Sequence, residues 1–147
     1  MGIHGSFRNL VFTKIHVMLV IPLILAGCRP SDGIKLGKVE GTVTVDGQPI
    51  EGAELTFQPD AARPSYGITD SAGHYFLQFT MDRDGAVVGK HTVSITTKRS
   101  QSGGEGGAPL IAARKEVLPA KYHTATELTR DVIAGANRID FELLTSK

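Results

Sequence analysis

The chain has 147 residues, with 16 Lys plus Arg against 15 Asp plus Glu and a formal net charge of +1. This near balance, without a basic stripe interleaved with aromatic residues, argues against nucleic-acid binding. Cys28 is the one cysteine, which excludes an intrachain disulfide, and the length suits one domain with its own core.

Residues 1–27 have the pattern of a secretory signal peptide. Two basic residues, Arg8 and Lys14, and no acid precede an apolar run over 15–26. That run is about 12 residues long, shorter than the roughly 20 that span a bilayer as a helix. We therefore predict a cleaved signal segment. The alternatives are a buried helix, an uncleaved membrane anchor, or cleavage by an ordinary signal peptidase without attachment of a lipid.

The residues Leu25-Ala26-Gly27-Cys28 resemble the lipobox of bacterial lipoproteins. The resemblance implies that Cys28 becomes the first residue of the mature protein and that its sulfur carries a diacylglycerol. It also implies a protein exported and anchored to the cell membrane or the outer membrane, facing the periplasm or the surface. Each buried methylene contributes about 0.8 kcal/mol, so two or three acyl chains hold a protein at a membrane.

After the leader, residues 28–37 are predicted to be a lipidated tether, because glycine, proline and polar residues dominate there. Residues 38–147 are predicted to form the folded domain. The 120 residues from Cys28 onward carry 14 basic and 15 acidic side chains, a formal net charge of −1.

Most of the domain alternates apolar and polar residues with the period of two that is typical of strands. Turn residues separate the runs, as in Asp46-Gly47 and Asp70-Ser71-Ala72-Gly73, and further turns are expected at 85–89 and at Gly135. Seven strands are expected, at 39–45, 53–58, 66–69, 75–79, 91–96, 126–133 and 137–144. One apolar face per strand predicts two sheets packed face to face, an all-β sandwich.

Residues 99–118 break the alternation and contain Ser-Gln-Ser-Gly-Gly-Glu-Gly-Gly. Long loops in compact domains are functional or disordered, and glycine is costly to order. We predict a mobile loop at one end of the sandwich.

Four segments together resemble carboxypeptidase-regulatory-like domains, also described as transthyretin-like. They are 41–57 (GTVTVDGQPIEGAELTF), 69–75 (TDSAGHY), 89–95 (GKHTVSI) and 137–143 (NRIDFEL). The long loop followed by Pro-Ala-Lys-Tyr at 119–122 is similar to small lipoproteins of planctomycete type. The resemblance covers about residues 38–144. It implies a seven-stranded, prealbumin-like sandwich with immunoglobulin-like topology, a module that accompanies catalytic domains elsewhere.

The residues offer no catalytic or metal site. Transthyretin-like hydrolases of 5-hydroxyisourate end in Tyr-Arg-Gly-Ser, whereas this chain ends in Leu-Thr-Ser-Lys. The three histidines of the domain lack zinc-site spacing, and we expect His91 in the core and His74 and His123 at the surface. The segment 82–85 is expected to be a hairpin turn, not a calcium loop. Ser71 has no nucleophile elbow around it. We therefore predict no enzyme activity and no cofactor.

Phe76 is the apolar residue on the otherwise polar face of its strand. Together with Tyr66 and Tyr122 it is a candidate aromatic platform for ligand binding. The alternative for Tyr122, with Lys121, is that it fastens the returning chain to the edge of the sandwich. The sequence thus predicts a non-catalytic structural or protein-interaction module of the cell envelope. The alternative is a module that binds carbohydrate or peptide at the cell surface.

Overall fold

The computed structural model describes residues 1–2, 33–104, 106 and 109–146. The predictions for the signal segment and for Cys28 fall outside these residues. Within them, no helix has the length and apolar character needed to cross a membrane.

The described chain is all-β, as the sequence predicts, with a single turn of 3-10 helix, η1 (Ala120–Tyr122). The strands are β1 (Leu36–Val45), β2 (Gln48–Pro49), β3 (Glu54–Pro59), β4 (Ser65–Ile68), β5 (His74–Phe76), β6 (Gln78–Thr80), β7 (Arg83–Asp84), β8 (Ala86–Val87), β9 (Gly89–Thr96), β10 (Thr129–Val132), β11 (Gly135–Arg138) and β12 (Phe141–Leu143).

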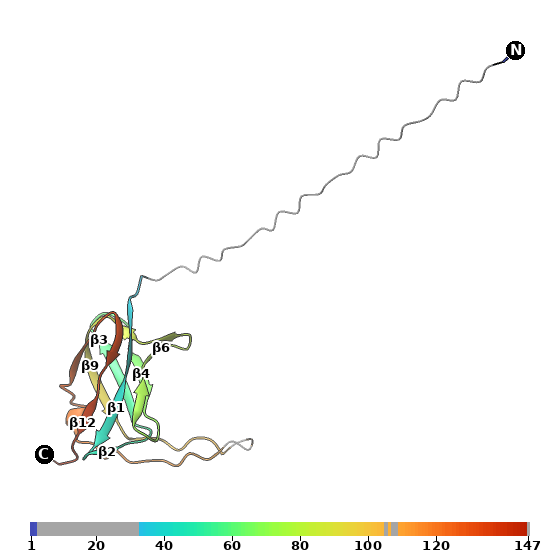
Figure 1. Ribbon diagram of the computed structural model, residues 1–147. Coiled ribbons are helices and arrows are strands. Elements are labelled where there is room, and N and C mark those ends of the chain that lie inside the picture. Colours follow the sequence, from blue (N-terminus) through green and yellow to red (C-terminus); the bar gives the residue numbers. More distant parts are fainter. Residues whose placement is uncertain (3–32, 105, 107–108, 147) are drawn as a thin grey trace. The chain divides into compact units, whose positions relative to one another are not determined.

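These strands form two sheets (Figure 1). In the first sheet, β1 is central and pairs in parallel with β11 and β12 on one side. On its other side β1 pairs antiparallel with β2, β5 and β8. The second sheet is antiparallel throughout, in the order β10-β9-β3-β4-β6-β7. The first strand of the domain and its last are therefore neighbours.

The core lies between the sheets and consists of the residues that the alternation points inward. Phe57 of the second sheet is fully buried, and its ring lies 6.2 Å from that of Phe141 in the first sheet, edge to face. Fully burying such a side chain stabilises a fold by about 1.5–3 kcal/mol. The other fully buried apolar residues are Val43, Ala53, Leu55, Leu77, Ala86, Val93 and Ile95. With no disulfide available, this packing holds the sheets together.

Several predicted elements differ from the structure. The strand expected at 137–144 is divided into β11 and β12, and β11 begins at Gly135, where a turn was expected. The hairpin turn expected at 82–85 contains β7. The strand expected at 75–79 is split, because β5 pairs with β1 in the first sheet and β6 pairs with β4 in the second. The chain thus passes from one sheet to the other at Leu77. The turn expected at 85–89 instead contains β8, which pairs with the start of β1 at Leu36 and Gly37. β1 consequently begins two residues before the predicted domain boundary.

The segment after β9 forms a two-stranded arm, which the alternation did not predict. Arg99 pairs with Arg114 and Ser102 pairs with Ile111, both antiparallel. Figure 1 shows this arm leaving the sandwich at the end opposite to the start of β1. The chain runs out along one side of the arm and returns along the other.

Two charged side chains fasten the base of the arm to the sandwich. The Arg114 guanidinium donates to the carbonyls of Thr97, Glu51 and Gly52, each at 2.6 Å. The Glu116 carboxylate accepts from the hydroxyls of Thr96 and Thr97 and from backbone N–H groups at 97–98 and 117–118. Burial alone would raise the pKa of Glu116, but these hydrogen bonds outweigh it and lower the pKa from 4.5 to about 2.

We expect Glu116→Gln to lower the free energy of unfolding at pH 7 by about 1–2 kcal/mol, reduced for solvent screening. The folded-state pKa of Glu116 lies below its unfolded value. Its contribution is therefore complete above about pH 4.5 and is lost as the pH falls toward 2. Urea denaturation across this range should show wild type and variant converging in acid. Glu127→Gln, an exposed glutamate, is the matched control and should follow wild type throughout.

Candidate binding face around Phe76

Phe76 points to solvent because its neighbours point into the core. Tyr75 and Leu77 are 3% and 0% exposed, whereas the Phe76 side chain between them is 61% exposed. The strand register places Glu40 of β1 directly beside Phe76 and places Arg138 of β11 beside Glu40. The outer face of the first sheet therefore carries a row of ring, carboxylate and guanidinium across three adjacent strands.

The second sheet adds two apolar side chains to this row. Tyr66 and Ile68 of β4 are 52% and 63% exposed, and both line a hollow of about 200 Å³ together with Phe76. Gly67 permits the close approach, since a Cβ there would lie 2.9 Å from the carbonyl oxygen of Phe76. We call the surface formed by Glu40, Tyr66, Ile68, Phe76 and Arg138 the Phe76 face.

Two larger hollows flank the Phe76 ring, and Glu40 borders both. The first, of about 420 Å³, also contains Ile68, Asp70, His74 and Arg138 in its wall. The second, of about 340 Å³, is also lined by Lys38, Leu77, Asp84, Gly85 and Asn137. The Phe76 ring thus stands between two concave, partly polar surfaces.

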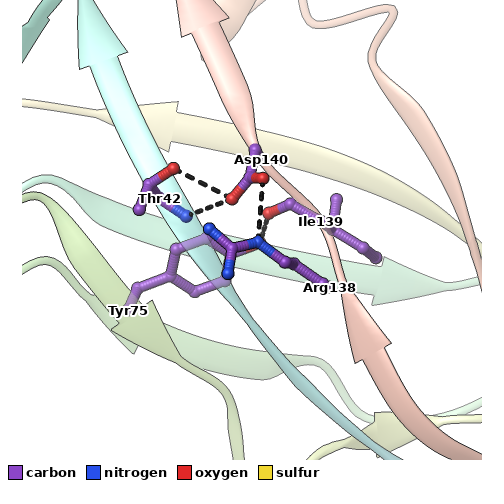
Figure 2. A network of polar contacts seen from close by, with 5 residues as sticks. All are labelled: Thr42, Tyr75, Arg138, Ile139 and Asp140. Atoms are coloured by element: carbon purple, nitrogen blue, oxygen red, sulfur yellow. Dashed lines mark hydrogen bonds and ion pairs between the residues drawn. The ribbon is translucent and has the colours of Figure 1, made fainter.

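The C-terminal chain is irregular between β11 and β12, next to Arg138 in the wall of the first hollow (Figure 2). Ile139 donates its N–H to the Glu40 carbonyl at 2.9 Å. Its own carbonyl accepts from the Tyr75 hydroxyl at 2.6 Å. Gly41 faces that carbonyl, and a Cβ there would lie 1.9 Å from the oxygen, so no side chain fits.

Asp140 completes the irregularity. Its Oδ1 accepts from the backbone N–H and the hydroxyl of Thr42 at 2.8 and 2.9 Å, and its Oδ2 accepts from Arg138 Nε at 3.2 Å (Figure 2). The Thr42 bonds, with Arg138, lower the pKa of Asp140, so the group is an anion at neutral pH. Burial, with this nearby charge, raises the pKa of Tyr75 far above its usual range and keeps its hydroxyl a donor.

The structure brings two of the three predicted platform residues together. Tyr66 and Phe76 share one surface, whereas the placement of Tyr122 on that platform was wrong. Tyr122 lies in η1, is 9% exposed and belongs to the core cluster. Its hydroxyl accepts from the N–H of Leu144 at 3.3 Å, which uses the polar end of the ring inside the fold.

Sequence reasoning missed Glu40, Ile68 and Arg138 as members of the face. Ile68 carried a signal, because it follows Tyr66 with the period of two on the same strand. The row of Phe76, Glu40 and Arg138 gave no signal in the sequence. Arg138 reaches this row through parallel pairing between the two ends of the domain, which a local pattern does not reveal.

The histidines lie where the sequence predicts. His91 is 1% exposed, packs 5.8 Å from the Phe57 ring and bonds through Nε2 to the Val87 carbonyl at 2.7 Å. His74 is exposed in the wall of the first hollow. His123 is partly exposed and bonds to the Leu118 carbonyl at 3.0 Å. In the described part of the chain, no three His, Cys, Asp or Glu side chains converge as a metal site would require.

The Asp70 turn has a structural role. Asp70 Oδ1 accepts from the N–H groups of Ala72 and His74, both at 2.9 Å, which is the local bonding expected of a turn aspartate. The fold therefore uses this carboxylate to bring β4 back to β5, beside the Phe76 face.

Comparison with known proteins gives no family. No family model matches the chain, and no curated protein matches it either. Among solved structures it is similar to a 9R-lipoxygenase from Cyanothece PCC8801, at 11% identity and a TM-score of 0.34. That match covers 75% of this chain and 16% of the lipoxygenase.

We expect Gly41→Ala to lower the free energy of unfolding by about 3 kcal/mol, the upper range for forcing atoms into a packed site. The new methyl group would meet the backbone carbonyl of Ile139, which cannot move without breaking its bonds to Glu40 and Tyr75. Lys38→Ala, an exposed side chain on the same strand, should change stability by less than about 0.5 kcal/mol. Equal urea midpoints for wild type and Gly41→Ala would contradict the close approach of Gly41 to the Ile139 carbonyl.

Proposed function

We propose that this protein is a lipid-anchored, non-catalytic module of the bacterial cell envelope that binds a partner through the Phe76 face. The observation that carries the proposal is the continuous exposed apolar surface of Tyr66, Ile68 and Phe76. Scattered exposed apolar residues are ordinary, but a contiguous group with a polar rim marks an interaction site. Glu40 and Arg138 form that rim.

The polar groups beside the face support binding rather than catalysis. Asp140 is engaged by Thr42 and Arg138, and the Tyr75 hydroxyl is engaged by the Ile139 carbonyl. Asp70 holds its own turn. These groups stabilise the surface, so a rigid binding platform is the role that their bonding supports.

We further propose membership of the carboxypeptidase-regulatory-like, prealbumin-like group. The all-β chain, its two sheets and the core between them support the assignment, together with the four sequence segments that resemble the family.

The proposed anchor lies at Cys28. The leader over 1–27 and the Leu-Ala-Gly-Cys sequence support it, and two or three acyl chains would hold the protein at the membrane. Only a few residues separate Cys28 from Leu36, where β1 begins.

We expect Cys28→Ser to release the protein from the membrane fraction. In wild type, mass spectrometry of the N-terminus should find Cys28 as the first residue with acyl chains attached. The serine variant should carry no acyl chains. A wild-type protein that fractionates as soluble, or that keeps residues before Cys28, would sink the anchor proposal.

A second candidate function is glycan binding at the same face. An exposed ring beside a carboxylate and a guanidinium offers a surface for the C–H face of a sugar and partners for its hydroxyls. The row of Phe76, Glu40 and Arg138 favours this candidate.

A photo-crosslinking experiment tests whether the Phe76 face meets a partner in the envelope. We expect p-benzoylphenylalanine at Tyr66 to give discrete adducts in intact cells. The matched control places the same group at Ile133, which is 63% exposed outside the Phe76 face. Equal adduct patterns at both positions, or none at Tyr66, would count against an interaction surface here.

A further inference from the structure

We propose that the Phe76 face binds an extended, basic polypeptide segment in which an apolar side chain lies between two lysine or arginine side chains. This inference rests on the proposed interaction function and names the chemistry of the partner. It follows from the charges around the face, the exposed ring, and the two hollows that share Glu40 and Phe76 in their walls.

The charge around the Phe76 ring is negative. Glu40, Asp70 and Asp84 border the two hollows, and none of the three carboxylates forms an ion pair with another described residue. Of the lysine and arginine side chains that line the hollows, Arg138 is paired with Asp140 at 3.2 Å, whereas Lys38 forms no ion pair with another described residue. A basic partner would therefore be complementary in charge, and an acidic one would be repelled.

The ring itself is suited to a cation or to an alkyl group. The Phe76 side chain is 61% exposed, and Glu40 lies beside it in the register. An ammonium or guanidinium is attracted to an aromatic face, and the alkyl stem of Lys or Arg covers apolar surface. Tyr66 and Ile68 continue the apolar surface beside the ring.

The two hollows suit a ligand that carries a cation on each side of an apolar group. They lie on either side of Phe76, with Glu40 in the wall of both, Asp70 in the first and Asp84 in the second. In an extended peptide, side chains on one face recur every second residue, roughly 6.6–6.8 Å apart. A peptide with an apolar side chain over the ring would direct its two flanking cations toward the carboxylates on either side of the ring. A Lys-x-Leu-x-Lys pattern has this form.

Binding of labelled peptides to the full chain in non-ionic detergent tests the proposal by fluorescence anisotropy. The probe is Lys-Ser-Leu-Ser-Lys, the charge-reversed control is Glu-Ser-Leu-Ser-Glu, and cellotetraose serves as an unlabelled neutral competitor. We expect the basic peptide to bind at least about tenfold more tightly than the acidic one at low salt, with the difference shrinking as salt is added.

Matched variants assign this binding to the face. Phe76→Ala should weaken binding of the basic peptide by roughly fivefold or more, whereas Ile133→Ala should leave that binding unchanged. Glu40→Gln should weaken it by roughly two- to fivefold, whereas Glu142→Gln, on the outer face of β12, should not. Circular dichroism of each variant checks that the sandwich is intact.

Three outcomes would overturn the inference. The first is equal binding of the acidic and basic peptides, and the second is no binding of either peptide. The third is displacement of the basic peptide by cellotetraose, with an affinity for cellotetraose that is the same in wild type and in Glu40→Gln. The last outcome would instead assign the face to a neutral glycan. Crosslinks at Tyr66 in cells with no preference for the basic peptide would leave the interaction function standing and remove only its proposed chemistry.

Discussion

The domain depends on the parallel pairing of β1 with the returning C-terminal chain, which lies close to β1 at Gly41. β1 is the strand on which every other member of the first sheet pairs. The C-terminal chain can lie against it because Gly41 leaves room for the Ile139 carbonyl and Tyr75 donates to that carbonyl. A chain without disulfides thus joins its first and last strands by backbone bonds and one buried hydroxyl.

The same closure creates the surface on the other side of the sheet. Because Ile139 turns inward toward Tyr75, the chain is displaced and Asp140 reaches the N–H of Thr42. Arg138, bonded to Asp140, then stands at the edge of the row that begins at Phe76. The residues that close the fold therefore also position the rim of the face, which links the stability of the domain to the shape of its binding surface.

The period-two pattern predicted the interior well because burial on one face of a strand is a local property of sequence. Leu55, Phe57, Val93 and Ile95 are fully buried as expected. What the pattern could not give was the pairing between distant segments. Tyr122 was therefore a candidate for the aromatic platform, although the chain folds η1 back onto the core.

The arm shows the same limit for a different reason. Its glycines argue for a loop, and nothing in their composition reveals that Arg114 and Glu116 fasten its base to the sandwich. These bonds reach backbone groups at 51–52 and 96–98, which are remote in sequence. Arm and Phe76 face are thus held by separate polar networks, one at the end of the sandwich and one across the first sheet. Because the networks share no residue, a change at the base of the arm should leave the geometry of the face intact.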